Sequence, residues 1–276
     1  MKRTNYIQKL MLMSLVMIFL FGVSDSFAQK KKKGKSSKTA QATPPSKKDK
    51  GPKKVSDEVK KLQEIGGLFT LYRDSTTGAL KMVIDEDQIG KEFIHWYYVE
   101  NGITEVRAFR GNFRGSKIFK IEKYYNKIEF VTVNTSSYFD PENALSKSAD
   151  ANISKSVLFS GKIAAGSEKE GKYLIDANGL FLSEALAMVK FPSFSRNPNA
   201  FKLGNLSKSK TKYADVNNYP ENTNISVEYV YENKLPKNGG SRAVTDARNI
   251  SIVVQHSLIQ VPENDFQPRY DDARMG

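Results

Sequence analysis

Two histidines are the only side chains of this 276-residue sequence with an ordinary pKa near neutrality, and cysteine is absent. His95 and His256 are far apart, and neither has a second histidine four residues away with which to share a helical face. A zinc site with three protein ligands would therefore need both histidines and a carboxylate from distant strands. Each histidine stands in an alternating aromatic or apolar stretch, which is typical of core positions. We therefore interpret both as buried core residues and assign no catalytic, cofactor-binding or metal-binding residue.

Other catalytic patterns are also missing. A serine triad would need a Gly-x-Ser-x-Gly elbow, and the sequence contains none. Gly111 and Gly115 are four residues apart but lack the Gly-Lys-Ser/Thr ending of a phosphate loop, so this stretch predicts a turn. The acidic run Asp85-Glu86-Asp87 falls on an expected loop, and we interpret it as a solvated surface. The residues alone therefore assign no enzyme activity to the chain.

Most of the positive charge lies in residues 29–61, which carry thirteen lysines against three acidic residues, a net charge of +10. This segment has almost no apolar side chains to offset the entropy of ordering, so we expect a disordered lysine-rich tether. The whole chain has a formal charge of +13, but residues 62–276 are close to neutral. We therefore expect no nucleic-acid partner. Two interpretations of the tether stay open: it binds anionic envelope polymers or lipid head groups, or it is a soluble spacer.

The first 28 residues have the composition of a signal peptide. Lys2, Arg3 and Lys9 precede the apolar run 10–23, and Ser26-Phe27-Ala28 places small residues at the two positions that a signal peptidase reads. Fourteen residues at about 1.5 Å each are too short to cross a hydrocarbon core of roughly 30 Å. The sequence thus predicts an exported protein, periplasmic or secreted, with no transmembrane anchor after cleavage before Gln29.

We expect an α+β, β-rich fold whose antiparallel sheets are built from hairpins and a meander, with one or two short packed helices. Alternating residues predict a hairpin over 67–84, a strand over 92–99 and a meander between 104 and 133. Asp140 and Pro141 are expected to begin a helix that ends near Asp150. Further strands are expected around 157–159 and 173–175. Leu182, Leu186 and Val189 recur at helical spacing and predict an amphipathic helix over 180–190.

The last third of the chain predicts a second β region. Residues 191–222 are polar, contain three prolines and are expected to be extended, whereas 223–261 reads as a pair of strands joined by a long loop. We accordingly divide the folded part into a β-rich N-terminal domain, 62–190, and a second β subdomain, 191–276. The sequence stops at Gly276 without completing an element, so we expect the second subdomain to be truncated at its C-terminal end.

Five blocks carry a resemblance to a known family: GLFTLYRDSTTGALKMVIDEDQIGKEFI (67–94), FRGNFRGSKIFKIEKYYNKIEFV (109–131), SSYFDPENALSKSADANIS (136–154), GKYLIDANGLFLSEAL (171–186) and PRYDDARMG (268–276). They resemble the N-terminal region, paired domains of unknown function, of exported zinc-dependent metalloproteases of gluzincin-like type from Bacteroidetes-like bacteria. The resemblance implies that a catalytic domain with a His-Glu-x-x-His helix and zinc follows in a complete member. The present chain stops before that domain, so no zinc ligand is carried over to any of its residues.

The resemblance implies a non-catalytic N-terminal scaffold of an exported zinc metallopeptidase, whose partner is the missing C-terminal protease domain. The alternative is a stand-alone envelope-associated module that binds an anionic polymer or a peptide. The coding sequence downstream of Gly276 distinguishes the two expectations.

Overall fold

The computed structural model describes residues 53–136, 142–149, 151–193, 195–263, 265–266 and 274. The expected signal peptide and most of the expected tether lie outside these residues. Among the described residues, no helix is long and apolar enough to cross a membrane.

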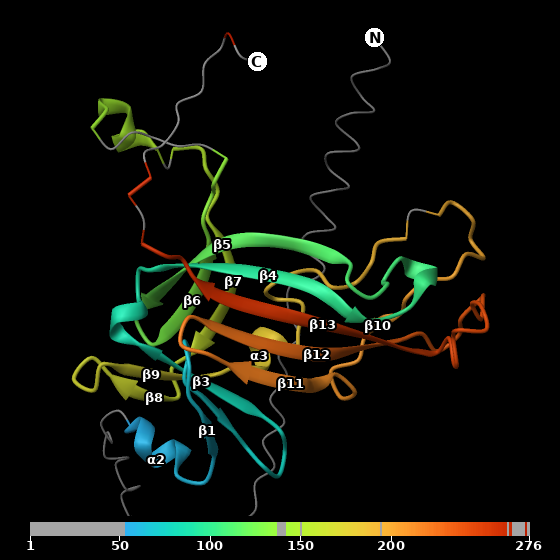
Figure 1. Cartoon of the computed structure of the whole chain (residues 1–276), viewed down its shortest axis with the longest axis horizontal. Coiled ribbons are helices and arrows are strands. Elements are labelled where there is room, and N and C mark those ends of the chain that lie inside the picture. Colours follow the sequence, from blue (N-terminus) through green and yellow to red (C-terminus); the bar gives the residue numbers. More distant parts are fainter. Residues whose placement is uncertain are drawn as a thin grey trace, which may run out of the picture. The chain divides into compact units, whose positions relative to one another are not determined.

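Antiparallel strands dominate the described chain and form two sheets (Figure 1). The smaller sheet has the order β1-β2-β3-β9-β8, with bounds Gln63–Ile65, Leu71–Arg73, Leu80–Asp85, Lys172–Asp176 and Ala165–Ser167 in that order. The larger sheet has the order β10-β12-β13-β4-β5-β6-β7, with bounds Asn205–Leu206, Asn222–Glu232, Asn249–Gln260, Glu92–Asn101, Phe113–Tyr124, Lys127–Thr132 and Ser156–Lys162. Strand β11, Lys212–Asn218, also pairs with β12. The expectation of a β-rich, antiparallel fold is confirmed.

Helices contribute less than an α+β class would suggest. The described residues contain two short α-helices, α2 (Val55–Val59) and α3 (Asn178–Phe181), and three 3-10 turns, Glu86–Gln88, Thr104–Val106 and Ala144–Ser148. The turn at Thr104–Val106 replaces the first strand of the expected meander, which therefore consists of β5 and β6. The turn at Ala144–Ser148 replaces the described part of the helix expected after Asp140, because its backbone bonds join residues three apart, as from Ala149 N–H to Ser146 O.

The amphipathic helix expected over 180–190 is wrong as a helix, although Leu186 and Val189 are buried as its pattern requires. Side chains of this segment bind the backbone groups that a helix would pair. The Ser183 hydroxyl donates to Gly179 O and accepts from Ala185 N–H, and Glu184 accepts from Lys190 N–H. Such local bonds offer the backbone an alternative to the helical ladder.

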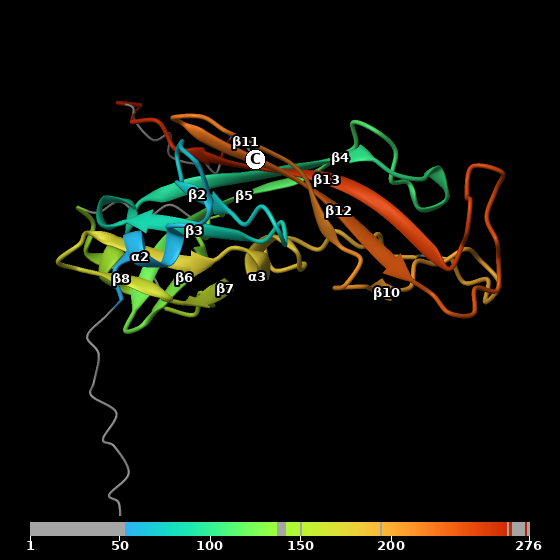
Figure 2. The ribbon, with the colours of Figure 1, turned by 90° about the horizontal axis from the view of Figure 1, so that it is seen from below.

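One hydrophobic core lies between the inner faces of the two sheets. A row of phenylalanine rings crosses it, with centroid distances of 5.1 to 5.9 Å between neighbours in the order Phe69, Phe93, Phe119, Phe130 and Phe159. Figure 2 shows β2, β3 and β8 grouped at one end, whereas β10, β12 and β13 extend away from them. The smaller sheet thus covers one end of the larger sheet.

Strands from both sides of the domain boundary expected at residue 190 share the larger sheet. Strand β13 pairs with β4 over Val253–Gln260, and β4 pairs in turn with β5. The core likewise includes buried residues from before and after the boundary. Burying one face of this sheet therefore requires both halves of the described chain.

The last residues of the expected tether are folded. Helix α2 packs Val55 and Val59 against Val83, Ala165 and Leu174 on the outer face of the smaller sheet. The backbone also takes part, since Gly166 N–H donates to Lys53 O at 2.8 Å. The two valines supply apolar area that the lysine-rich composition of the segment conceals.

Candidate functional site

The structure brings the two histidines together on the inner face of the larger sheet. His95 lies on β4 and His256 on the neighbouring β13, where they occupy diagonal positions of the strand register. Their side chains are 0% and 1% exposed. His95 Nε2 lies 3.0 Å from His256 Nδ1, and the two rings are nearly parallel with centroids 5.2 Å apart. The interpretation of both as buried core residues is confirmed.

A hydrogen-bond chain runs from this pair to helix α3, and its direction follows from its last member. The carbonyl of Phe181 can only accept, so the Tyr229 hydroxyl donates to it, at 2.7 Å. That hydroxyl has one hydrogen, so at 2.8 Å it accepts from His256 Nε2–H. Neutral His256 then presents Nδ1 as an acceptor, and His95 Nε2–H donates to it. His95 Nδ1 is left as a buried acceptor without a partner among the described residues.

Both imidazoles are held in the neutral form. Burial is the main cause that lowers the pKa of His95 to about 2, and the neighbouring His256 and Lys117 lower it further. Burial alone lowers the pKa of His256 to about 3. Burial also raises the pKa of Tyr229 well above its ordinary value. None of the three side chains of this hydrogen-bond chain therefore exchanges protons near neutral pH.

Zinc, which the family resemblance implies for a complete member, does not fit these histidines. Both nitrogens of His256 and Nε2 of His95 are engaged in the hydrogen-bond chain, which leaves one free nitrogen. No group of three or more histidine, aspartate or glutamate side chains that could hold a metal ion occurs within the described ranges. The arrangement ties β4, β13, β12 and α3 together, and its chemistry is structural.

A cleft of about 860 Å³ lies beside this hydrogen-bond chain. Tyr97 connects the two, because its ring stacks on His95 with centroids 5.1 Å apart and also lines the cleft. The other lining residues come from the segment before β5, from the start of β5 and from the stretch between Met188 and Leu203. Those that matter chemically are the cations Arg107, Arg114 and Lys202 and the rings of Phe191 and Phe201.

Arg114 reaches the cleft because of a bulge in β5. The register shifts so that Tyr97 pairs with Gly115 and Tyr98 with Phe113, which leaves Arg114 as the extra residue. Gly115 has φ of 148°, and a Cβ there would lie 3.3 Å from the Tyr97 ring. The Arg114 guanidinium lies over the Phe191 ring, with Cζ 3.7 Å from the ring centroid. A bulge commonly re-aims a side chain in this way.

The sequence motifs that we interpreted as non-catalytic have structural roles. Asp85 and Gln88 cap the 3-10 turn reciprocally, Glu86 accepts from the Tyr173 hydroxyl, and Asp87 lies 3.7 Å from the Lys91 ammonium. Gly111 has φ of 81°, a conformation that favours glycine, in the turn before β5. Sequence reasoning missed Tyr229 and Arg114, because neither belongs to a recognisable motif.

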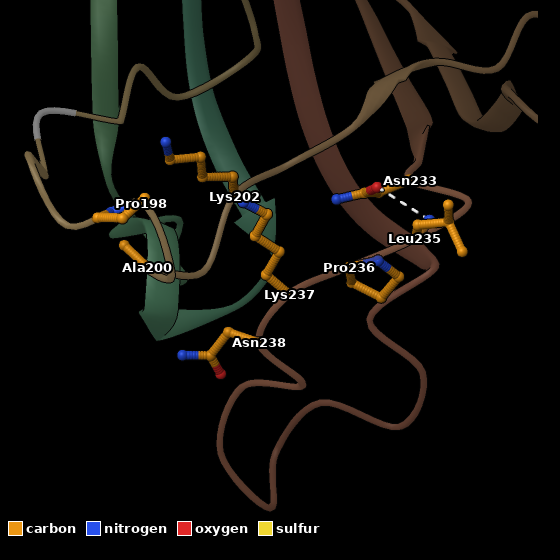
Figure 3. Close-up of a pocket in the computed structure, with 8 residues that line it drawn as sticks. All are labelled: Pro198, Ala200, Lys202, Asn233, Leu235, Pro236, Lys237 and Asn238. Carbon is orange, nitrogen blue, oxygen red and sulfur yellow. Dashed lines mark hydrogen bonds between the residues drawn. The ribbon is translucent and has the colours of Figure 1, made fainter.

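A smaller cavity of about 330 Å³ lies between two loops (Figure 3). Its lining side chains shown there come from the stretch before β10 and the loop after β12, namely Pro198, Ala200 and Lys202 on one side and Asn233, Leu235 and Pro236 on the other. The dashed bond is from Leu235 N–H to the Asn233 side chain at 3.3 Å. The charged residues that line this cavity are Lys202 and Lys237, and its lining contains no carboxylate.

The outer face of the larger sheet carries an apolar surface, which we call the outer apolar face. Trp96 and Phe113 are 48% and 56% exposed, and their rings form an edge contact with centroids 6.0 Å apart. Half-buried aliphatic residues surround them on β4, β5 and β13, namely Ile94, Ile118 and Ile259. The solvent-exposed face of an antiparallel sheet usually carries polar side chains, whereas several side chains on this face are apolar.

Comparison with known proteins gives one match. Neither the curated proteins nor the solved structures contain a match to this chain. A family model matches residues 111–276, which include the Arg114 bulge, His256, Tyr229 and every strand from β5 onward. This match spans more than half of the sequence, and the chain therefore belongs to the family described as Domain of unknown function (DUF5117).

Proposed function

We propose that this chain is the non-catalytic N-terminal scaffold of an exported zinc-dependent metallopeptidase and that the protease domain docks on the outer apolar face. The observation that carries the proposal is the exposed pair Trp96 and Phe113 among half-buried isoleucines. Exposed apolar patches on soluble proteins commonly mark interaction surfaces. The family resemblance supplies the nature of the partner.

The path of the chain supports this choice of surface. Strand β13 ends at Gln260, which pairs with Phe93 at the start of β4. The preceding residue, Ile259, belongs to the outer apolar face and pairs with Ile94. Residues that follow β13 therefore depart from the rim of this face, so residues 261–276 link this rim to a domain that follows Gly276.

The histidine geometry favours a scaffold over an independent enzyme. A hydrolytic zinc site needs about three protein ligands and an open position for water. Here the imidazoles bind each other and a tyrosine, inside the core. The second candidate, a stand-alone binding module for an anionic polymer or peptide, is favoured by the lysine-rich segment and by the cations that line the cleft.

The test begins with the coding sequence beyond Gly276. The scaffold proposal expects an in-frame stretch that encodes His-Glu-x-x-His, whereas unrelated sequence would favour the binding module. The longer product is then compared with a Trp96→Ser, Phe113→Ser double variant by hydrogen exchange. We expect increased exchange in the protease domain of this variant and no increase in a Tyr125→Ser control, which removes an exposed ring from the β5–β6 turn. Equal exchange in all three proteins would contradict docking on this face.

A further inference from the structure

We propose that the cleft beside Tyr97 binds a carboxylate of an extended peptide, with Arg114 as the anchoring residue. The inference does not depend on the scaffold role, because the cleft lies on the inner face of the larger sheet and the outer apolar face lies on the opposite side. Its volume of about 860 Å³ falls in the range of roughly 300–1,000 Å³ that is common for ligand sites.

Arg114 is the first group that points to an anionic ligand, because its charge has no counterion among the described residues. Its Nε is buried without a hydrogen-bond partner, and no carboxylate lies within 4.0 Å of the guanidinium among the described residues. Contact with the Phe191 ring offsets part of the desolvation of one guanidinium face. A desolvated cation is stable when it is paired and hydrogen-bonded. The planar guanidinium matches a carboxylate, which can accept two of its hydrogen bonds in parallel.

The remaining polar groups of the cleft also favour an anion. Arg107 and Lys202 line it without an ion pair to any described residue. The single acidic lining residue, Glu105, accepts hydrogen bonds from the backbone and hydroxyl of Ser241, which lower the pKa of its carboxyl group. The Tyr97 hydroxyl makes no hydrogen bond among the described residues and offers a further donor. Three cations thus face one carboxylate that is already engaged.

Two features indicate a peptide as the source of the carboxylate. The walls of the cleft include apolar side chains, Met188, Phe191 and Phe201, which suit the side chains next to a carboxylate. The N-terminal half of β5 is a free edge within the part of the chain that the structure describes, since β6 pairs with β5 only from Phe119 to Tyr124. Unpaired backbone groups over Phe113–Lys117 can add an extended strand next to Arg114. A polyanion would need neither an apolar wall nor a strand edge.

The experiment measures binding of labelled peptides to the full chain by fluorescence anisotropy at 150 mM salt. The probes are dye-Ala-Leu-Ala-Glu-Ala-amide, its Gln counterpart, and dye-Ala-Leu-Ala-Ala-Ala with a free C-terminal carboxylate. We expect at least one carboxylate probe to bind roughly tenfold more tightly than the Gln peptide, since a charge-assisted bond exceeds a neutral one by about that factor. The Glu probe and the free-carboxylate probe distinguish a side-chain source from a terminal source.

Variants then assign the binding to Arg114. Arg114→Ala should weaken carboxylate binding roughly tenfold or more, and Arg114→Lys should restore only part of it because the bidentate fork is lost. Arg110 is an exposed arginine of the turn before β5 and lies outside the cleft, so Arg110→Ala is the matched control and should change nothing. Tyr97→Phe removes one donor without truncating the ring and should weaken binding a few-fold while the thermal midpoint stays unchanged.

Several outcomes would overturn the inference. Equal affinity for the carboxylate and Gln peptides would exclude recognition of the charge. Equal losses in the Arg110 and Arg114 variants would indicate nonspecific attraction. Arg114-dependent binding to phosphatidylglycerol vesicles, with no binding to either carboxylate peptide, would assign the cleft to a lipid head group.

Discussion

Acid should unfold this protein at an unusually high pH, because its only two histidines are both buried and neutral. In the folded chain the pKa values of His95 and His256 are lowered to about 2 and about 3. In the unfolded chain both return to about 6.5. Below pH 6.5 the unfolded state therefore binds more protons than the folded state. The stability that the neutral pair contributes is complete above pH 6.5 and is lost progressively as pH falls toward about 3.

The magnitude follows from the number of protons. Each group that is protonated only in the unfolded state lowers the free energy of unfolding by about 1.4 kcal/mol per pH unit. Two histidines over the two pH units from 6.5 to 4.5 therefore remove about 5 kcal/mol. Single domains are stable by about 5–15 kcal/mol, so this loss is a large fraction of the total. Carboxyl groups such as Asp246, whose pKa its bond to Arg248 lowers to about 2, add losses only below about pH 5.

The assay is urea unfolding of the full chain at intervals between pH 5.5 and 7.5, followed by circular dichroism. We expect uptake of about 1.8 protons on unfolding at pH 5.5, and His95→Leu should reduce this number to about 0.9. The proton number does not depend on how much the substitution destabilises the fold. A free energy of unfolding that is flat between pH 5.5 and 7.5 would refute the burial of neutral histidines.

Three further predictions concern stability and binding to anionic surfaces. Tyr229→Phe leaves the buried His256 N–H without an acceptor and Phe181 O without a donor, so it should lower the free energy of unfolding by about 2–4 kcal/mol in urea. The control is Tyr213→Phe, which removes a buried hydroxyl with no partner among the described residues and should lower the free energy of unfolding by less than about 1 kcal/mol. Equal losses in the two variants would contradict the hydrogen-bond chain through Tyr229. Val59→Ala should lower the midpoint of thermal unfolding, because it removes about 1–3 kcal/mol from the free energy of unfolding. Removal of residues 1–52 should leave this midpoint unchanged but weaken salt-sensitive binding to anionic vesicles. Unchanged vesicle binding would instead favour the spacer interpretation of the lysine-rich segment.

Strands were predictable because alternation is a local property of the sequence. The pattern over 250–258 requires every second residue to be buried, and β13 follows it, with Ile252 and Val254 inside. The same reasoning predicted β4 around Trp96. Which strands pair with one another was harder to predict, because pairing depends on register and on strands more than a hundred residues away. The neighbour of β4 across the sheet, β13, could not be read from either segment alone.

The helix prediction was wrong where polar side chains form hydrogen bonds with backbone groups that a helix would pair. Leu182, Leu186 and Val189 have the spacing of an apolar helical stripe, and the last two are buried in a segment that is not helical. Periodicity reports which residues face the core, and it does not report that Ser183 and Glu184 bind the backbone locally. The folded helix α2 escaped notice for the opposite reason, since only two valines mark it within a lysine-rich stretch.

The candidate site was predictable only in its parts, and the connection between those parts has a functional consequence. The strand over 92–99 was predicted, and His95 and Tyr97, two residues apart in it, share its inner face. The stretch Gly111–Gly115 was interpreted as a turn, but β5 already begins at Phe113. The bulge that aims Arg114 at Tyr97 depends on one extra residue in β5, which no local pattern specifies. Tyr97 both lines the cleft and stacks on His95, whose neighbour His256 is bound to Tyr229. The wall of the cleft therefore rests on the hydrogen-bond chain, so acid should abolish peptide binding along the unfolding curve, and not through a separate titration of the cleft.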